Sequence, residues 1–259
     1  MKLRLFAIFL IILSPLLWRG AGGEVFAQNR NIDSLLTLLK KPTTNDTIKL
    51  HILVSLSEEC DEQDILKYAK PAVELANKLL SVIPSEVDEQ NKPSTPLRLT
   101  INKQKALALN NIGYICNRQG QIKEALDYYH YSLKIQEEIN DKTGIAASLI
   151  NIGFIYNNQG NATQALDYYQ KSLKIQQEIK DNYGISYSLN NIGAIYEKQG
   201  DVKQALDYNL KALKMAEELG NKQLQANTLG NIGTSYYKQG QLKVSLTYYS
   251  RSLKIRKEI

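Results

Sequence analysis

One motif, Asn-Ile-Gly, recurs four times in this chain at a constant spacing of 40 residues. Seven residues after each motif glycine stands a second glycine, followed by an Ala-Leu-x-Tyr-Tyr block or a variant of it. The four motif asparagines are Asn111, Asn151, Asn191 and Asn231. Four copies at one spacing predict an array of structural repeats whose neighbours bury a continuous core.

Each repeat is predicted to be a helical hairpin, because no proline interrupts it and its apolar residues are spaced three and four apart. In the first helix, Leu109, Ile112 and Cys116 share one face with Gly113. A glycine inside a helix costs about 1 kcal/mol relative to alanine, so its recurrence indicates close approach of the second helix. The residues expected there are Ala125, Ala165, Ala205 and Ser245, with Tyr129, Tyr169 and Tyr249 filling the space beside them.

The turn inside each hairpin carries helix-capping signals. The second glycine of each repeat is predicted to end the first helix in the left-handed conformation. These glycines are Gly120, Gly160, Gly200 and Gly240. Asn161 with Gln164, and Asp201 with Gln204, resemble capping boxes that start the second helix.

The pattern Leu-x-x-Ile-Gly-x-x-Tyr, then Gly, then Ala-Leu-x-Tyr-Tyr-x-x-Ser-Leu, over residues 100–259, resembles the tetratricopeptide repeat. The resemblance implies an all-α fold, a right-handed superhelical solenoid of antiparallel helix pairs. The common form has about 34 residues; the longer period here is similar to that of kinesin light chains and cell-polarity adaptors. The usual proline near the end of the second helix is absent. Asn209 stands where a core tyrosine is expected, which predicts looser packing in the third repeat.

These patterns divide the chain into segments. The segments are residues 1–27 (signal peptide), 28–81 (N-terminal helix and degenerate repeat), 82–99 (loop), and 100–140, 141–180, 181–220 and 221–259 (repeats one to four). Pro71 is expected to kink the second helix of the degenerate repeat or to mark its start. Three prolines among polar residues favour a surface loop before the regular array. The spacing of apolar residues from Ile32 to Leu39 predicts a short helix that covers the first face of the array.

The N-terminus has the pattern of a targeting segment. Lys2 and Arg4 precede an apolar run over residues 5–17, and residues 25–27 offer a cleavage site. The run is short for a membrane span, so we expect an exported protein, periplasmic or extracellular. Because charged residues separate the run from the cleavage site, an uncleaved membrane anchor is the alternative.

Two cysteines, Cys60 and Cys116, do not make a disulfide framework. Cys116 occupies the position of Tyr156, Tyr196 and Tyr236 in the later repeats. We therefore expect it to be buried and to pack as a small apolar side chain.

One face of each first helix lies opposite its core-facing stripe. At about 100° per residue this face carries four rows, and in stacked hairpins it lines the concave side of the superhelix. The rows are Leu107, Ala147, Tyr187 and Asn227; Asn111, Asn151, Asn191 and Asn231; Tyr114, Phe154, Ala194 and Thr234; and Arg118, Asn158, Lys198 and Lys238.

The second of these, here named the asparagine row, does not vary. Asparagine is an indifferent helix former, but its amide offers a donor and an acceptor to the backbone of an extended peptide. In similar repeats such a row grips a peptide. The alternative is that these side chains bond neighbouring helices or face water. The predicted peptide-binding groove comprises Asn110, Asn111, Tyr114, Arg118, Asn151, Phe154, Asn158, Tyr187, Asn190, Asn191, Lys198, Asn231, Tyr237 and Lys238.

A second binding mode of the family, a carboxylate clamp for chaperone C-termini, requires lysine and arginine at particular groove positions. The residues at the position of the first clamp lysine are Asn110, Ile150, Asn190 and Gly230. The sequence therefore does not support a clamp.

Catalytic constellations are missing from the sequence. His51 and His130 are the only histidines, and neither has another metal-type residue at ligand spacing. Asp127, Asp167 and Asp207 lie one turn from lysines, which indicates a solvated, charge-balanced face. We expect no enzyme activity, no catalytic or metal-binding residue and no cofactor. A net charge of +6 spread along the chain also argues against nucleic acid as a partner.

Two functions remain. The first is an exported scaffold that binds a protein or an extended peptide in the groove. The second is the extracytoplasmic input segment of a bacterial signalling protein, such as a histidine kinase, cyclase or transcription regulator, with its effector domain elsewhere. An enzyme is a distant third. Leu246 and Leu253 lack a polar capping helix, so self-association through that end of the array is a further expectation.

Overall fold

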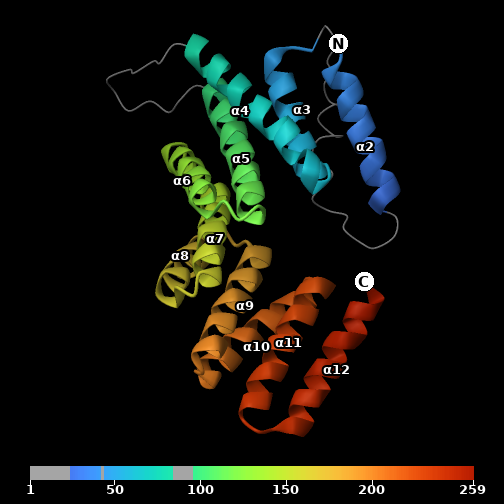
Figure 1. Cartoon of the computed structure of the whole chain (residues 1–259), viewed down its shortest axis with the longest axis vertical. Coiled ribbons are helices and arrows are strands. Elements are labelled where there is room, and N and C mark those ends of the chain that lie inside the picture. The colour runs from blue at the N-terminus through green and yellow to red at the C-terminus, as the bar shows by residue number, and fades with distance from the viewer. Residues whose placement is uncertain (1–23, 42–43, 84–95) are drawn as a thin grey trace. The chain divides into compact units, whose positions relative to one another are not determined.

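The computed structural model describes residues 24–41, 44–83 and 96–259, and every regular element in these ranges is helical (Figure 1). The chain divides into two compact units, residues 1–44 and 45–259. The first contains α2 (Glu24–Leu39), after which the Thr44 hydroxyl donates to the carbonyl of Leu38 at 2.7 Å. A helix is thus confirmed at the predicted N-terminal position, and its covering of the first face of the array stays a prediction. Most of the predicted signal peptide lies outside the described residues, although α2 already begins at Glu24. No helix in the described ranges is long and apolar enough to cross a membrane.

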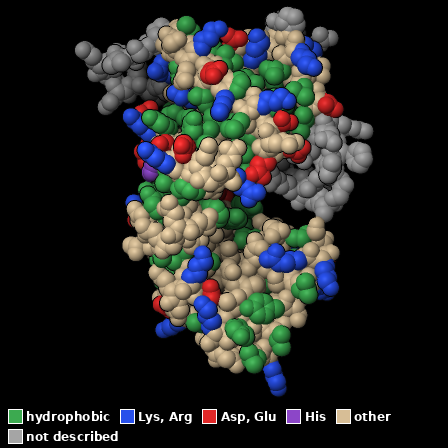
Figure 2. All heavy atoms as spheres, viewed as in Figure 1, with side chains coloured by type: hydrophobic (Ala, Val, Ile, Leu, Met, Phe, Trp, Pro, Cys, Tyr) green, Lys and Arg blue, Asp and Glu red, His purple; other side chains and the backbone are tan. Residues whose placement is uncertain are grey.

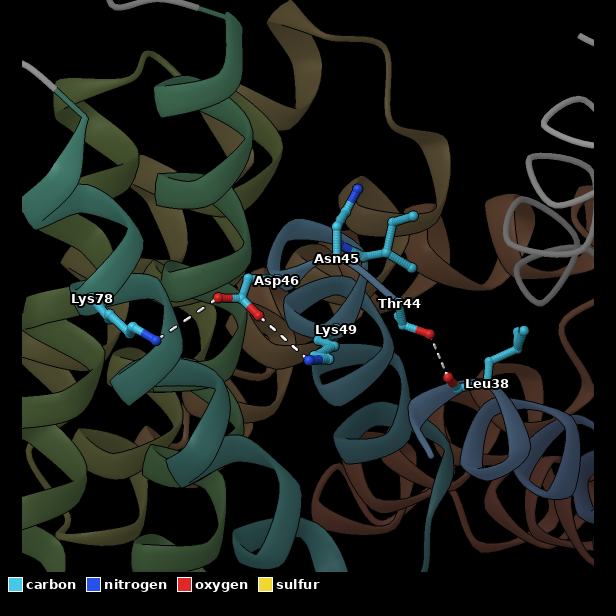
Figure 3. Close-up of polar contacts among 7 residues, drawn as sticks. Leu38, Thr44, Asn45, Asp46, Lys49 and Lys78 are labelled. Atoms are coloured by element: carbon cyan, nitrogen blue, oxygen red, sulfur yellow. Dashed lines mark hydrogen bonds and ion pairs between the residues drawn. The ribbon is translucent and has the colours of Figure 1, made fainter. Parts of the chain in front are cut away.

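The second unit begins with the degenerate repeat, α3 (Asp46–Glu59) and α4 (Ile65–Val82), joined through the 3-10 helix η2 (Glu62–Asp64). Asn45 caps α3 by accepting from the amide of Ile48. Asp46 lies between Lys49 of its own helix and Lys78 of α4, at 3.5 and 3.9 Å (Figure 3). These contacts fix the start of α3 against α4.

Of the two alternatives for Pro71, a helix start is excluded, because α4 begins at Ile65 and continues through the proline. A second expectation about this region was wrong. The loop predicted over residues 82–99 is too long at its C-terminal end, since α5 (Pro96–Arg118) starts at Pro96. Proline suits the first position of a helix, where its missing N–H has no partner to lose. Residues 84–95 lie outside the described ranges.

The regular array consists of eight helices, α5 to α12, in antiparallel pairs as predicted (Figure 1). After α5 these are α6 (Ile122–Glu138), α7 (Lys142–Asn158), α8 (Ala162–Glu178), α9 (Asn182–Gln199), α10 (Val202–Glu218), α11 (Lys222–Lys238) and α12 (Leu242–Glu258). Each second helix also packs on the first helix of the next pair, so the core continues from repeat to repeat. This is the all-α solenoid that the repeats predict.

The motif glycine allows the close helix contact that its recurrence indicates. A Cβ on Gly113 would lie 2.9 Å from the ring of Tyr129, and one on Gly233 would lie 2.9 Å from the ring of Tyr249. The tyrosine therefore packs directly on the glycine backbone. Cys116 is buried in the same core, as expected, and burial raises the pKa of its thiol.

Helix ends follow the predicted capping chemistry. The four turn glycines have φ between 75° and 82°. Asn161 and Asp201 accept from the amides of Gln164 and Gln204, at 3.1 and 3.0 Å. The second contact of the Asn161 cap joins the two side chains, whereas a capping box would use the backbone amide of the cap residue. Left-handed residues also occur between repeats, where the sequence did not predict them, at Asn140, Lys180 and Gly220.

The third repeat differs in its core. Asn209 takes the position of the tyrosine, opposite Gly193, and it is fully buried. Within the described residues, neither its Oδ1 nor its Nδ2 has a hydrogen-bond partner. The third repeat therefore differs from the others in having a buried amide without a hydrogen-bond partner in place of a tyrosine ring.

Candidate functional site

The asparagine row is half-buried in all four regular repeats, but its members do different things. Asn111 donates through Nδ2 to the hydroxyl of Ser57 on α3 at 2.8 Å. Asn231 donates to Oδ1 of Asn190 on α9 at 3.1 Å. These two asparagines join their helix to the preceding repeat, which was the alternative interpretation of the row.

The two central members are available. Within the described residues, the side chains of Asn151 and Asn191 make no hydrogen bond, and both are partly exposed. For Asn191 the reason is visible in the sequence. The acceptor of Asn231 is Asn190, and the equivalent position for Asn191 is Ile150, which has no polar side chain. The amide of Asn191 is thus without a hydrogen-bond partner among the described residues.

Aromatic side chains lie on the same helices as the two available asparagines. Phe154 is 46% exposed and Tyr187 is 41% exposed. Tyr183, one turn before Tyr187, stacks on it with ring centroids 6.4 Å apart. Tyr183 is not among the predicted groove residues, although its four-residue spacing from Tyr187 places it on the same face. Tyr114 and Tyr237 are also exposed, on α5 and α11.

The fourth row mainly links repeats. Arg118 pairs with Glu62 of η2 at 2.7 Å, and Lys238 pairs with Glu197 of α9 at 2.7 Å. Lys198 donates to Oδ1 of Asn157 at 3.2 Å. Asn158 is exposed. The charges of Arg118 and Lys238 are therefore partly neutralised by the preceding repeat, and a ligand would have to compete for these two side chains.

Asn110 and Asn190 differ from the other predicted groove residues, because both are buried. Oδ1 of Asn110 accepts from the Ser148 hydroxyl at 3.2 Å, and Oδ1 of Asn190 accepts from the Thr228 hydroxyl at 2.8 Å. The structure places them in contacts between successive first helices. These two residues of the predicted groove therefore hold successive repeats together by hydrogen bonds.

A depression of about 500 Å³ lies beside Arg118. Its lining residues are Asp61, Glu62, Gln63, Ile115, Arg118 and Gln119. The Arg118–Glu62 pair crosses this lining, and the carboxylate of Glu62 raises the pKa of the Arg118 guanidinium. Among the described residues, no group of three potential metal ligands comes together.

The sequence model of the tetratricopeptide repeat matches residues 104–178, 144–218 and 184–258, which together exceed half of the chain. The chain belongs to the tetratricopeptide repeat family. Comparison with curated protein sequences gave no match. The family assignment and the hairpin geometry agree, so the tetratricopeptide array is the frame of the candidate site.

Solved structures share this fold at low sequence identity. BtubC (BKLC) from P. vanneervenii is 18% identical, with a TM-score of 0.65, covering 90% of this chain and 89% of that one. A signal transduction ATPase (STAND) protein with a tetratricopeptide repeat sensor from Pyrococcus horikoshii is 19% identical, with a TM-score of 0.68, covering 90% and 34%. NprR in complex with its cognate peptide NprX is 22% identical, with a TM-score of 0.57, covering 89% and 62%.

Proposed function

We propose that this tetratricopeptide protein is a non-catalytic scaffold that binds an extended peptide, or an extended segment of a protein, on the face of Asn151 and Asn191. The observation that carries the proposal is that these two amides lack a partner within the described residues. A peptide backbone offers the alternating N–H and C=O groups that a side-chain amide can pair with.

The surroundings of the two asparagines support a peptide rather than a small polar ligand. Phe154 and Tyr187 expose aromatic surface on the same helices, and such surface binds alternate side chains of an extended peptide. NprR, which has a similar fold, is described in complex with its cognate peptide. We propose that this chain uses its array in the same general manner.

Peptide display with the full chain as bait would test the proposal. Enriched peptides would be synthesised and their Kd measured by fluorescence anisotropy. For Asn151→Ala/Asn191→Ala we expect binding about tenfold weaker or worse, because two amide–backbone hydrogen bonds are lost. The thermal midpoint should change little, since neither amide bonds another helix.

Asn111→Ala/Asn231→Ala is the matched control. Both side chains join neighbouring repeats, so this variant should lose stability by about 1 kcal/mol per bond and keep peptide affinity. Failure of display to enrich any peptide, or equal loss of affinity in both variants, would contradict the proposed face.

A second proposal, that the array is the extracytoplasmic sensory segment of a signalling protein, has one specific support. The Pyrococcus horikoshii relative in fold is described as carrying its tetratricopeptide repeats as a sensor. A coding region that continues past Ile259 into an effector domain would favour this proposal. A stop codon there, with a stable monomeric product fractionating with the cytoplasm, would count against it.

A further inference from the structure

An apolar stripe runs along one side of α12, and one of its residues, Tyr249, also packs on Gly233 of α11. Leu242, Leu246, Tyr249 and Leu253 follow one another at spacings of four, three and four residues. At 100° per residue they fall within about 60° of the helix circumference, which is the width of a coiled-coil seam. Each keeps between 37% and 63% of its surface exposed, and Figure 2 shows hydrophobic side chains at the surface of the C-terminal helices. We name these four residues the α12 stripe.

The same positions are covered by a helix in each of the three preceding repeats. On α6, for example, Ile122, Leu126 and Leu133 pack with the first helix of the next repeat. The covering helices present aliphatic residues three apart, namely Ile152 and Ile155, Ile192 and Ile195, and Leu229 and Ile232. The α12 stripe therefore has the shape of a surface that receives a helix.

The charge of α12 departs from that of the other second helices. α12 carries five Lys or Arg and one acidic residue, whereas α6 has two and four, α8 two and two, and α10 three and three. Arg251 pairs with Glu217 of α10, and Glu258 pairs with Lys222 of α11. Within the described residues, Lys243, Lys254 and Lys257 have no acidic partner. The stripe is thus bordered by uncompensated positive charge.

We propose that the α12 stripe docks an amphipathic helix from another polypeptide, with an apolar seam flanked by Asp and Glu. Isoleucine or leucine side chains three residues apart would fill the stripe as they do within the array, and the flanking carboxylates would pair with Lys254 and Lys257. This site lies apart from the asparagine row, so it is independent of the proposed peptide-binding face.

Two other occupants fit the observations less well. A second copy that docked through its own α12 would bring like charges together, which destabilises a helix pair. A membrane surface would attract the lysines, but a helix that lies in a bilayer interface has a wide apolar face, and the α12 stripe is narrow.

The test uses the full chain and two synthetic helical peptides with identical isoleucine and leucine seams. One peptide has glutamate at every flanking position, and the other has lysine there. Titration by fluorescence anisotropy should show binding of the glutamate peptide, at least tenfold weaker binding of the lysine peptide, and weakening of the former as salt is raised.

Paired variants locate the site on α12. Lys254→Glu/Lys257→Glu should weaken binding of the glutamate peptide at least tenfold. Lys174→Glu/Lys214→Glu changes the net charge equally at positions equivalent to Lys254 on α8 and α10, and it should leave the affinity nearly unchanged. Leu246→Ala/Leu253→Ala should also abolish tight binding while circular dichroism stays helical, because alanine favours helix and both leucines are exposed.

Four outcomes would overturn the proposal. These are equal affinity for both peptides, no binding of the glutamate peptide up to its solubility limit, equal loss in the two charge variants, and binding of anionic phosphatidylserine vesicles that the glutamate peptide does not displace. Concentration-dependent dimerisation, abolished by Leu246→Ala/Leu253→Ala, would instead assign the stripe to a second copy.

Discussion

At the scale of single residues, glycine serves two separate purposes in this array. Gly113 lies inside a helix so that the ring of Tyr129 can pack on its backbone, whereas Gly120 ends that helix with a positive φ. The first role depends on space and the second on backbone conformation. A substitution at the first kind of position is therefore expected to act through steric overlap, and one at the second kind through backbone strain.

Gly113→Ala should destabilise the protein by about 1–3 kcal/mol, because the new Cβ would lie 2.9 Å from the Tyr129 ring. Gly230 is the control. It lies inside α11, and the nearest atom to a new Cβ there is the Ser252 hydroxyl at 3.9 Å. Gly230→Ala should stabilise by about 0.5–1 kcal/mol through helix propensity. Urea unfolding measures both. Destabilisation by both substitutions would show that packing does not distinguish the two sites.

Lys180→Gly is expected to stabilise the protein by about 0.5–1 kcal/mol. Lys180 has φ of 56°, a conformation that costs a side chain with a Cβ about 1–2 kcal/mol, partly offset by the greater unfolded-state freedom of glycine. Gly220 already occupies the equivalent position in the next repeat. Asn140→Gly should gain less, since asparagine tolerates this conformation. The shift in thermal midpoint tests the order, and a larger gain at Asn140 would contradict it.

At the scale of the helix pair, the repeats differ in the residues that join the second helix of one pair to the first helix of the next. Gln136 of α6 accepts from the Ser148 hydroxyl of α7 and lies where a Cβ on Gly144 would reach it. In the third repeat the equivalent pair is Ala216 and Leu224. Glutamine opposite glycine and alanine opposite leucine fill a similar space. The total side-chain volume at this contact is therefore similar, although its chemistry changes.

Asn209→Tyr tests the packing of the third hairpin. Replacing a buried, unpaired amide by the tyrosine of the first two repeats should stabilise the protein by about 1–2 kcal/mol. Tyr169→Asn is the reverse change against Gly153, and it should destabilise by about 3 kcal/mol. Chemical unfolding compares the two variants. If Asn209→Tyr also destabilises, the amide of Asn209 has a role that the tyrosine cannot replace.

At the scale of the whole array, stability is expected to vary along the chain. A solenoid repeat is stabilised by its neighbours. Among the described helices, α12 packs mainly on α11, with one ion pair to α10 and its stripe exposed. Backbone amides of α12 should therefore exchange hydrogen faster than those of α8, which is covered on both sides. Hydrogen exchange with mass spectrometry measures this gradient. Addition of the glutamate peptide should slow exchange in α12 selectively, and equal protection of α8 and α12 in the free protein would contradict the expectation.

The sequence alone determined the repeat, the helix pairs, the glycine–tyrosine contact and the turn glycines. Each of these features depends on residues that lie close together in the chain or on the exact period of the repeat. It can therefore be predicted from the sequence alone. It also placed Cys116 in the core, because three equivalent tyrosines mark that position. The start of α5 was misplaced, since Pro96 signals a loop and a helix start equally well.

Only the tertiary structure decided how the asparagine row is used. All four asparagines share the Asn-Ile-Gly motif, but their contacts with the preceding repeat differ. Ser57 and Asn190 bind two of them, and Ile150 offers Asn191 no polar side chain. Within the described residues, Asn151 makes no hydrogen bond, although Asn110 stands at the position equivalent to Asn190. The burial of Asn110 and Asn190 could not be predicted from the sequence for the same reason. Such contacts join residues 38 or more positions apart, and only packing of one hairpin on the next defines them.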